Sequence, residues 1–389
     1  MRLLPLIGRW CLLTMFLASN TTKPMQGATN DNRYMAYIGT YTVRGSRGIY
    51  SVSFDAASGR LSSLGLRAET TNPSFVVVHR NGRFLYAVNE ISDYKGQQSG
   101  AVRAYRIDPQ TGALKLLNQK SSGGAGPCYI SVDASGKYIL VANYQSGSVA
   151  TFPVFGDGSL GDRSAFEQHH GSSVNPVRQK APHAHSIVTS PDNRFAISAD
   201  LGIDKLIVYR FKADNGSLTP SDSPSAAVPL GEGPRHFVFH PNGRLLFVVN
   251  ELASTVSVFS YERDTAKLKL QQTISTLPAD FSGNNDAADI HIDFQGKFLY
   301  VSNRGRDSIK VFAVDAATGN LTSIADVPSG GKTPRNFAID PTGRYLIVAN
   351  EDSDNVVTFN IDPTSGKLHA TGNVVAVPSP VCIAFVRHQ

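Results

Sequence analysis

The chain has 389 residues, of which 41% are hydrophobic and 17% charged, and its formal net charge is +6. This apolar content is sufficient for a folded core and excludes a disordered chain. With only three cysteines, the chain is neither a disulfide scaffold nor a cysteine-rich zinc module. Its basic residues form no run of the kind that binds nucleic acid, so we expect no nucleic-acid partner.

Residues 1–28 are predicted to be a signal peptide and leader. Arg2 is followed by an apolar run that only Arg9 interrupts, and a polar segment of small residues follows from Asn20 to Asn32. The run is too short and too interrupted to span a bilayer stably, and no later stretch reaches about 18 apolar residues. We therefore expect no stable membrane insertion and an exported protein, periplasmic or extracellular. Without a functional leader the protein would be cytoplasmic.

One strand–turn–strand motif recurs along the rest of the chain. An apolar strand leads into a turn such as HPNG at 240–243 or DPTG at 340–343, where Asp, Asn and Gly supply the dihedral angles of a tight turn. A second strand, rich in β-branched and aromatic residues, follows the turn. Copies of the motif begin at residues 73, 127, 184, 234, 287 and 334, and a truncated seventh copy begins at residue 380.

A third strand and a second turn follow each full copy. This turn has the form x-Gly-x-Leu, as in TSGKL at 364–368, with the variant TAKL in the repeat that begins at 234. Four short strands in a unit of about 50 residues are typical of a β-propeller blade. We predict an all-β fold, a single seven-bladed β-propeller domain over residues 33–389. The N-terminal segments 34–42 and 47–55 would complete the truncated blade, so that pairing of the N- and C-terminal strands closes the ring.

The motif places the start of its first strand beside the end of its second strand, at one rim of the propeller channel. The pairs that we expect to meet there are Arg235 and Glu251, Arg335 and Glu351, Arg304 and Asp289, and His185 and Asp200. The charged rim positions belong to blades three to six. In blades one, two and seven we expect the rim to be nearly neutral.

Arginine and histidine beside carboxylates are typical of a site for a small anion, because guanidinium groups bind carboxylate or phosphate in a bidentate manner. The ion pairs could instead do no more than brace neighbouring strands. His183 with His185, and Asp289 with His291, have the i, i+2 spacing that places two side chains on one face of a strand, which suits a metal. Because the nearby guanidinium groups repel a divalent cation, we expect neither a metal nor a cofactor.

Three segments carry a resemblance to a known family: GEGPRHFVFHPNGRLLFVVNEL (231–252), AADIHIDFQGKFLYVSNR (287–304) and TPRNFAIDPTGRYLIVANE (333–351). They resemble the seven-bladed β-propeller lactonases, which include the propeller-type 6-phosphogluconolactonases and the fungal carboxymuconate lactonizing enzyme. The resemblance covers residues 34–389. It implies a hydrolase that opens a sugar-type lactone at the channel mouth by metal-free general acid/base catalysis. The catalytic residues that it implies are His185, Arg235, Glu251 and Arg335.

Other polar residues of the rim would bind the substrate, a small-molecule lactone or sugar acid. These are His183, His236, Asp289, His291, Asn336 and Glu351. Arg235, with Arg335, would stabilise the charge that develops on the lactone carbonyl oxygen. Either Glu251 or His185 would activate a water molecule, and the other would protonate the leaving alkoxide.

Two other functions are compatible with the sequence. One is an exported, non-catalytic binding propeller of the YVTN-repeat type. The other is a carboxymuconate-type lactonizing isomerase, which would use the same residues on a carboxylated diene. The leader departs from the family pattern, because gluconolactone 6-phosphate is a cytosolic metabolite, so an exported member would act on another sugar lactone or acid. We expect a monomer or weak dimer.

Overall fold

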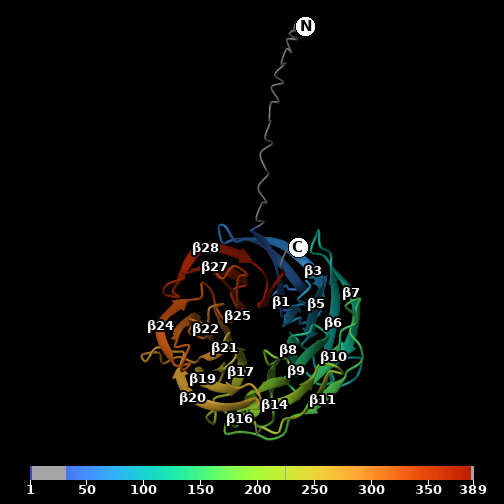
Figure 1. Ribbon diagram of the computed structural model, residues 1–389, viewed down its shortest axis with the longest axis vertical. Helices are drawn as coiled ribbons and strands as arrows, with labels where there is room; N and C mark the ends of the chain where they lie inside the picture. Colours follow the sequence, from blue (N-terminus) through green and yellow to red (C-terminus); the bar gives the residue numbers. More distant parts are fainter. Residues whose placement is uncertain (2–31, 224, 387–389) are drawn as a thin grey trace. The chain divides into compact units, whose positions relative to one another are not determined.

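Seven β-sheets, arranged in a ring, make up the part of the chain from Arg33 to Val386 (Figure 1). The computed structural model describes residue 1 and residues 32–223 and 225–386. Apart from Met1, the predicted signal peptide and leader lie outside the described residues. The prediction of an all-β, seven-bladed propeller is confirmed.

Blades one to three each begin with the strand nearest the centre of the ring. Blade one consists of β4 (Val76–Val78), β5 (Phe84–Asn89), β6 (Ala101–Ile107) and β7 (Leu114–Ser121). Blade two consists of β8 (Pro127–Val132), β9 (Tyr138–Asn143), β10 (Ser148–Pro153) and β11 (Ala165–Gln168). Blade three consists of β12 (Ala184–Thr189), β13 (Phe195–Asp200), the 3-10 helix Leu201–Ile203, β14 (Lys205–Lys212), β15 (Ser217–Pro220) and β16 (Ala226–Ala227). Blade three thus has one strand more than expected, because β16 pairs with β14 beside β15.

Blades four to six repeat the four-stranded pattern. Blade four consists of β17 (Pro234–Phe239), β18 (Leu245–Asn250), β19 (Thr255–Glu262) and β20 (Lys267–Ser275). Blade five consists of β21 (Asp286–Ile292), β22 (Phe298–Arg304), β23 (Ser308–Val314) and β24 (Leu321–Pro328). Blade six consists of β25 (Pro334–Ile339), β26 (Tyr345–Asn350), β27 (Asn355–Ile361) and β28 (Leu368–Ala376). Among the described residues, no helix is long and apolar enough to cross a membrane.

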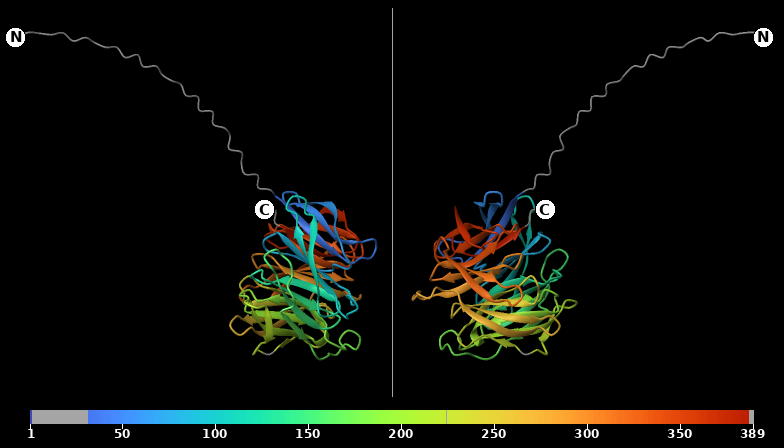
Figure 2. Two further views of the ribbon diagram at one scale, coloured as in Figure 1. Left: turned by 90° about the vertical axis from the view of Figure 1, so that its right-hand side faces the viewer. Right: turned by 60° about the vertical axis from the view of Figure 1, so that its left-hand side comes forward.

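The two ends of the chain build blade seven and close the ring. Its strands are β29 (Pro380–Val386), β1 (Arg33–Thr40), β2 (Gly48–Asp55) and β3 (Arg60–Glu69). β29 runs antiparallel to β1, with Tyr37 opposite Ala384 and Ile38 opposite Ile383. The blue N-terminal strands and the red C-terminal strands lie side by side in both views of Figure 2. The predicted pairing of the chain ends is therefore confirmed, and it removes the exposed edges that an open array would leave.

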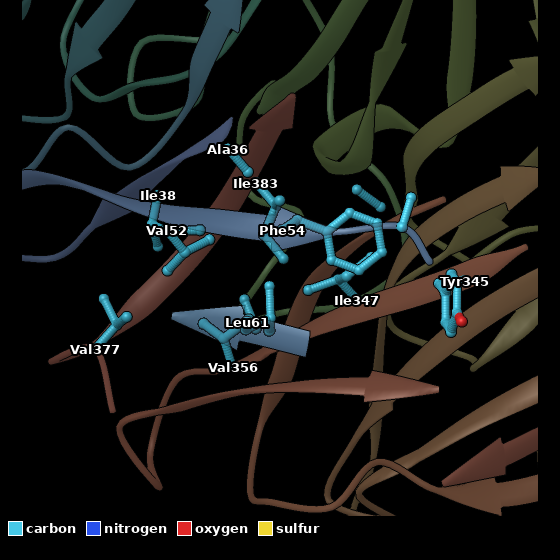
Figure 3. Close-up of a cluster of buried hydrophobic side chains, with 13 residues drawn as sticks. Ala36, Ile38, Val52, Phe54, Leu61, Tyr345, Ile347, Val356, Val377 and Ile383 are labelled. Atoms are coloured by element: carbon cyan, nitrogen blue, oxygen red, sulfur yellow. The ribbon is translucent and has the colours of Figure 1, made fainter. Parts of the chain in front are cut away.

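Apolar side chains fill the interfaces between neighbouring blades. In the part of the chain that the structure describes, seven buried clusters correspond to the seven interfaces of the ring. Figure 3 shows the cluster between blades six and seven, where Val52 and Phe54 of β2 pack with Tyr345 and Ile347 of β26. The rings of Phe54 and Tyr345 meet edge to face, with their centroids 5.5 Å apart. Burial of this apolar surface fixes the closing blade to its neighbour.

The x-Gly-x-Leu turns explain how adjacent blades fit together. Gly366 has a φ of +68°, and a Cβ atom there would lie 2.4 Å from the ring of Phe298 in blade five. Gly59 has a φ of +71° and the same relation to Tyr345 in blade six. Glycine adopts this positive φ without strain and has no Cβ atom, so each of these two turns can pack directly against the preceding blade. In the TAKL variant, Ala266 adopts a φ of +57°.

A β-bulge near the start of the inner strand positions the rim side chains. In β17, Pro234 pairs with Asn250 and His236 pairs with Val249, so Arg235 is an extra residue. A bulge interrupts the alternation of faces and re-aims a side chain. The side chains of the consecutive residues Arg235 and His236 therefore touch, at 3.3 Å. The equivalent extra residues of other blades are Cys128, His185, Arg335 and Val381.

Candidate active site

The carboxylate of Glu251 is the centre of an arginine cluster. Glu251 directly follows β18 and is buried, with 3% of its surface exposed. Its Oε2 accepts a hydrogen bond from Nε of Arg235 at 2.9 Å and lies 3.0 Å from Nη2 of Arg304. Its Oε1 accepts a hydrogen bond from Nη2 of Arg178 at 2.6 Å. Three guanidinium groups from different segments of the chain therefore share one buried carboxylate.

This cluster fixes the charges of its members. Burial by itself would raise the pKa of the Glu251 carboxyl, but the guanidinium groups of Arg304 and Arg235 hold that pKa well below its usual range. Burial and the like charges of Arg304 and Arg335 lower the pKa of Arg235 to about 10, so Arg235 stays protonated at neutral pH. Its Nη1 donates to the carbonyl of Ala288, whereas its Nη2 makes no hydrogen bond to the described residues.

His185, the extra residue of the bulge in β12, lies beside this cluster. Its Nε2 is 3.8 Å from Oε2 of Glu251, which is too long for a hydrogen bond. Its Nδ1 lies 3.7 Å from Sγ of Cys128. Burial and the charge of Arg235 hold the pKa of His185 well below its usual range. The imidazole is therefore neutral at neutral pH, with the carboxylate close to it but not bonded to it.

A second ion pair belongs to blade six. Nη1 of Arg335 is 3.8 Å from Oε2 of Glu351. Burial raises the pKa of Glu351, and the charge of Arg335 opposes this effect without cancelling it. Nη2 of Arg335 donates to the hydroxyl of Tyr41 at 2.8 Å, and that hydroxyl donates to Oε2 of Glu90 at 3.0 Å. The polar rim thus continues through the hydroxyl of Tyr41 in blade seven to the carboxylate of Glu90 in blade one.

Directly beyond the bulges, a buried layer is organised around Asp289. Nδ1 of His236 lies 2.8 Å from Oδ1 of Asp289, Nε2 of His291 lies 3.1 Å from Oδ2, and the amide of Asn336 donates to Oδ2. Burial would raise the pKa of Asp289, but His291 and His236 hold it below its usual range. Burial and the charge of Arg235 lower the pKa of His236 to about 4. Both oxygens of this carboxylate are therefore engaged within the layer.

A cavity of about 510 Å³ adjoins this layer. His236, Asp289, Asn336 and His291 line the cavity together with apolar residues of the inner strands, and none of the four predicted catalytic residues does. Tyr129 also lines the cavity, and its ring centroid is 5.0 Å from that of His236. Among the described residues, no group of three or more His, Cys, Asp or Glu side chains is arranged to hold a metal ion.

The predicted site residues therefore fall into two sets. Those gathered around the arginine cluster and the second ion pair are His183, His185, Arg235, Glu251, Arg335 and Glu351. Those of the buried layer and the cavity are His236, Asp289, His291 and Asn336. The bulge separates the sets, because it shifts the side chain that follows it by one position along the channel.

The predicted pairing of Arg304 with Asp289 is wrong. Arg304 contacts Glu251 of the preceding blade, and its guanidinium also donates to the carbonyls of Asp286 and Ala287. Two residues of β21 are unpaired between Ala287 and Ile290, and this irregularity turns Asp289 into the buried layer instead.

The predicted pairing of His185 with Asp200 is also wrong. The carboxylate of Asp200 lies 2.6 Å from Nδ1 of His169 and accepts a hydrogen bond from the backbone N–H of His183. Asp200 occupies the buried position that the other repeats give to Asn at the end of the second strand, as in Asn250. That position faces away from the rim.

Four residues of the rim were not predicted, and three of them carried a signal. Tyr41, Glu90 and Tyr144 directly follow the end of their strands, in the same repeat position as Glu251. The expectation of a nearly neutral rim is therefore wrong for blade one, where Glu90 adds a carboxylate, because it compared only the starts of the inner strands. In blades seven and two, Tyr41 and Tyr144 add polar but uncharged groups. Arg178 lies between β11 and β12, outside the repeat, so no periodic signal marks it.

The structure is thus a seven-bladed propeller that gathers arginines, a neutral histidine and a buried glutamate, and guanidinium groups are the side chains that bind anionic groups in a bidentate manner. The chain matches the family model "Lactonase, 7-bladed beta-propeller" over residues 35–385. It belongs to this family, a family of lactone-hydrolysing enzymes, as the sequence predicts.

Individual relatives agree with this membership. The chain is 39% identical to a 6-phosphogluconolactonase of Bacillus subtilis, over 92% of this chain and 99% of that protein. It is 36% identical to a 6-phosphogluconolactonase of Formosa agariphila, over 78% of this chain and 85% of that protein. Among solved structures, it is similar to the periplasmic gluconolactonase of Pseudomonas aeruginosa, with a TM-score of 0.86 and 38% identity, over 92% of this chain and 100% of that chain.

Proposed function

We propose that the protein hydrolyses a sugar-type lactone at the mouth formed by Glu251, Arg235, His185 and Arg335, by general acid/base catalysis without a metal. The relatives are named as gluconolactonases with or without a 6-phosphate, which supports a lactone of a six-carbon sugar acid. The observation that carries the proposal is the buried Oε2 of Glu251, which accepts a hydrogen bond from Arg235 and lies 3.8 Å from the neutral His185.

The arginines would act on the lactone carbonyl. Negative charge develops on the carbonyl oxygen when water attacks, and fixed guanidinium donors stabilise it. Arg235 is held in place by Glu251 and by the carbonyl of Ala288, so its free Nη2 needs no reorganisation during the reaction. Arg335 supplies a second positive charge on the same rim.

We assign the general base to His185. Both oxygens of Glu251 are already engaged by guanidinium groups, so that carboxylate is poorly placed to take a proton from water. His185 is neutral, takes one proton from the attacking water, and becomes an imidazolium 3.8 Å from the Glu251 carboxylate. The carbonyl then re-forms, the ring C–O bond breaks, and the imidazolium returns the proton to the leaving oxygen. The product is the open hydroxy acid.

We also propose that the enzyme is exported. The predicted leader at 1–28 supports this location, as does the similarity to a gluconolactonase described as periplasmic.

Hydrolysis of a lactone panel tests the proposed function. Gluconolactone and its 6-phosphate would be supplied to the wild type, His185→Gln and Glu251→Gln, with and without EDTA. We expect turnover that EDTA does not change, and a fall of about 10²- to 10⁴-fold in kcat for His185→Gln. His79→Gln is a matched control, because His79 lies in the first turn of blade one and bonds to the carbonyl of Gly136.

Two results would contradict the proposal. Loss of turnover with EDTA would exclude the metal-free mechanism. Absence of turnover above the spontaneous rate on every lactone would favour the alternative of a binding propeller.

A further inference from the structure

Arg178 is the most exposed guanidinium of the cluster. Its side chain is 35% exposed, whereas the side chains of Arg235 and Arg304 are 3% and 13% exposed. Its Nη2 donates to Oε1 of Glu251 and, at 3.0 Å, to the hydroxyl of Tyr144. Its Nε and Nη1 have no acceptor within the described part of the chain. Arg178 therefore presents unused, charged donors at the mouth.

The buried carboxylate of Asp204 fixes the loop 169–183, which carries Arg178. Asp204 accepts four hydrogen bonds and is 1% exposed. Two come from the loop, from the hydroxyl of Ser173 and from the amide of Gln179 at 2.7 Å. The other two come from the backbone N–H groups of Gly231 and Gly233, both at 2.7 Å. One carboxylate thus joins the loop of Arg178 to the segment that leads into Arg235.

The two ends of the loop are also anchored. His169 lies between Asp200, at 2.6 Å, and the hydroxyl of Tyr209, at 2.8 Å, and all three side chains are buried. At the other end, the ring of His183 stacks on Tyr144, with centroids 4.5 Å apart and an interplanar angle of 16°. This rigid support is the kind that holds a binding group ready for a ligand.

On the basis of the proposed lactonase function, we propose that Arg178, together with Tyr144 and His183, forms a subsite for an anionic substituent of the substrate. The substituent is a phosphate or a carboxylate at the end of the sugar lactone remote from its carbonyl. Both bidentate faces of the guanidinium include Nη2, so a two-point contact with either group forms when Nη2 turns from Glu251 and Tyr144 to the ligand and donates together with Nε or Nη1.

The geometry allows one ligand to reach both places. Arg178 and Arg235 bind opposite oxygens of the same Glu251 carboxylate, so a six-carbon sugar acid can span the two guanidinium groups. If Arg178 turns to a ligand, Glu251 keeps Arg235 and Arg304 as partners. Glu251 then stays ionised and continues to hold Arg235 in place.

Binding of stable product analogues tests this subsite. Calorimetry would measure the Kd of gluconate, 6-phosphogluconate and glucarate for the wild type, Arg178→Gln and Arg178→Lys. We expect the wild type to prefer one of the two ligands that carry a second anionic group over gluconate by about 10- to 100-fold, the effect of a charge-assisted hydrogen bond. Arg178→Gln should abolish this preference, with a much smaller change in gluconate binding, and Arg178→Lys should retain part of it. Arg60→Gln, at an exposed arginine that begins β3 on the outside of blade seven, is the matched control.

The outcomes distinguish a phosphate from a carboxylate as the bound group. They also distinguish failure of the subsite proposal from failure of the lactonase proposal. A preference for 6-phosphogluconate identifies a phosphate subsite, and a preference for glucarate identifies a carboxylate subsite. Equal affinity of the wild type for all three ligands would overturn the inference. An equal loss for all three ligands in Arg178→Gln would also overturn it, because Arg178 would then only position Glu251. Hydrolysis of uncharged gluconolactone is measured separately: if no variant hydrolyses it while the binding preference depends on Arg178, the lactonase proposal fails and the subsite stands.

Discussion

At the residue scale, the charge of His185 sets the pH dependence of the proposed reaction. A general base must be neutral, and burial together with Arg235 holds the pKa of His185 well below its usual range. Protonation would therefore remove activity only at acid pH. We expect kcat/KM, corrected for spontaneous hydrolysis, to be level from about pH 6.5 to about pH 9, where Arg235, with its pKa of about 10, is still protonated, and to fall below pH 6.5.

Glu251 provides the matched variant for this pH profile. Its negative charge favours the imidazolium of His185, so Glu251→Gln should move the acid limb of the residual activity to still lower pH. An acid limb of the wild type at or above pH 6.5 would contradict the assignment of His185 as the base.

Asp289 is expected to stabilise the folded protein. Its buried carboxylate accepts hydrogen bonds from His236, His291 and Asn336. An asparagine at this position would place its NH2 group, a hydrogen-bond donor, against one of these donors. We expect Asp289→Asn to lower the free energy of unfolding by about 2–4 kcal/mol at pH 7, measured by urea denaturation.

The sign of the pH effect follows from the depressed pKa of Asp289. A carboxyl whose folded-state pKa is lowered contributes stability above its unfolded pKa of about 3.9 and loses that contribution at lower pH. The difference between the wild type and Asp289→Asn should therefore shrink at about pH 3. A constant difference would show that the charge of Asp289 does not stabilise the fold.

At the scale of the strand and turn, two glycines of blade six show how much the contact between a turn and the neighbouring blade contributes to stability. Gly366→Ala places a Cβ 2.4 Å from the Phe298 ring at a φ of +68°. We expect it to lower the stability by about 2–4 kcal/mol, from backbone strain and overpacking together. Gly372→Ala has a φ of +78° but no neighbour within 4 Å, so its cost should be only about 1 kcal/mol. Equal losses for both variants would show that the contact with the neighbouring blade is unimportant.

At the scale of the whole molecule, closure depends on the core between blades six and seven. Phe54 is fully buried there and contacts the rings of Tyr345 and Phe385. We expect Phe54→Ala to lower the free energy of unfolding by about 3–5 kcal/mol, seen as a lower urea midpoint. Phe294→Ala, at a side chain that is 61% exposed, should change it by less than about 0.5 kcal/mol. A small effect of Phe54→Ala would mean that strand pairing alone closes the ring.

The sequence by itself determined the number of blades, the closing role of both chain ends and the meeting of Arg235 with Glu251. These features follow from local alternation, turn chemistry and a repeat whose copies fold alike, so each can be derived within one blade. Tyr41, Glu90 and Tyr144 belonged to the same pattern and could have been predicted from their position after the second strand.

Only the tertiary structure decided which charges share a partner. Arg304 reaches Glu251 across the boundary between two blades, and Arg178 reaches it from a loop outside the repeat. The bulges divide the predicted residues into the rim around Glu251 and the buried layer around Asp289. Contacts between blades depend on how the ring closes, and a bulge changes where a side chain points without changing the repeat. Neither effect is encoded in the period of the sequence.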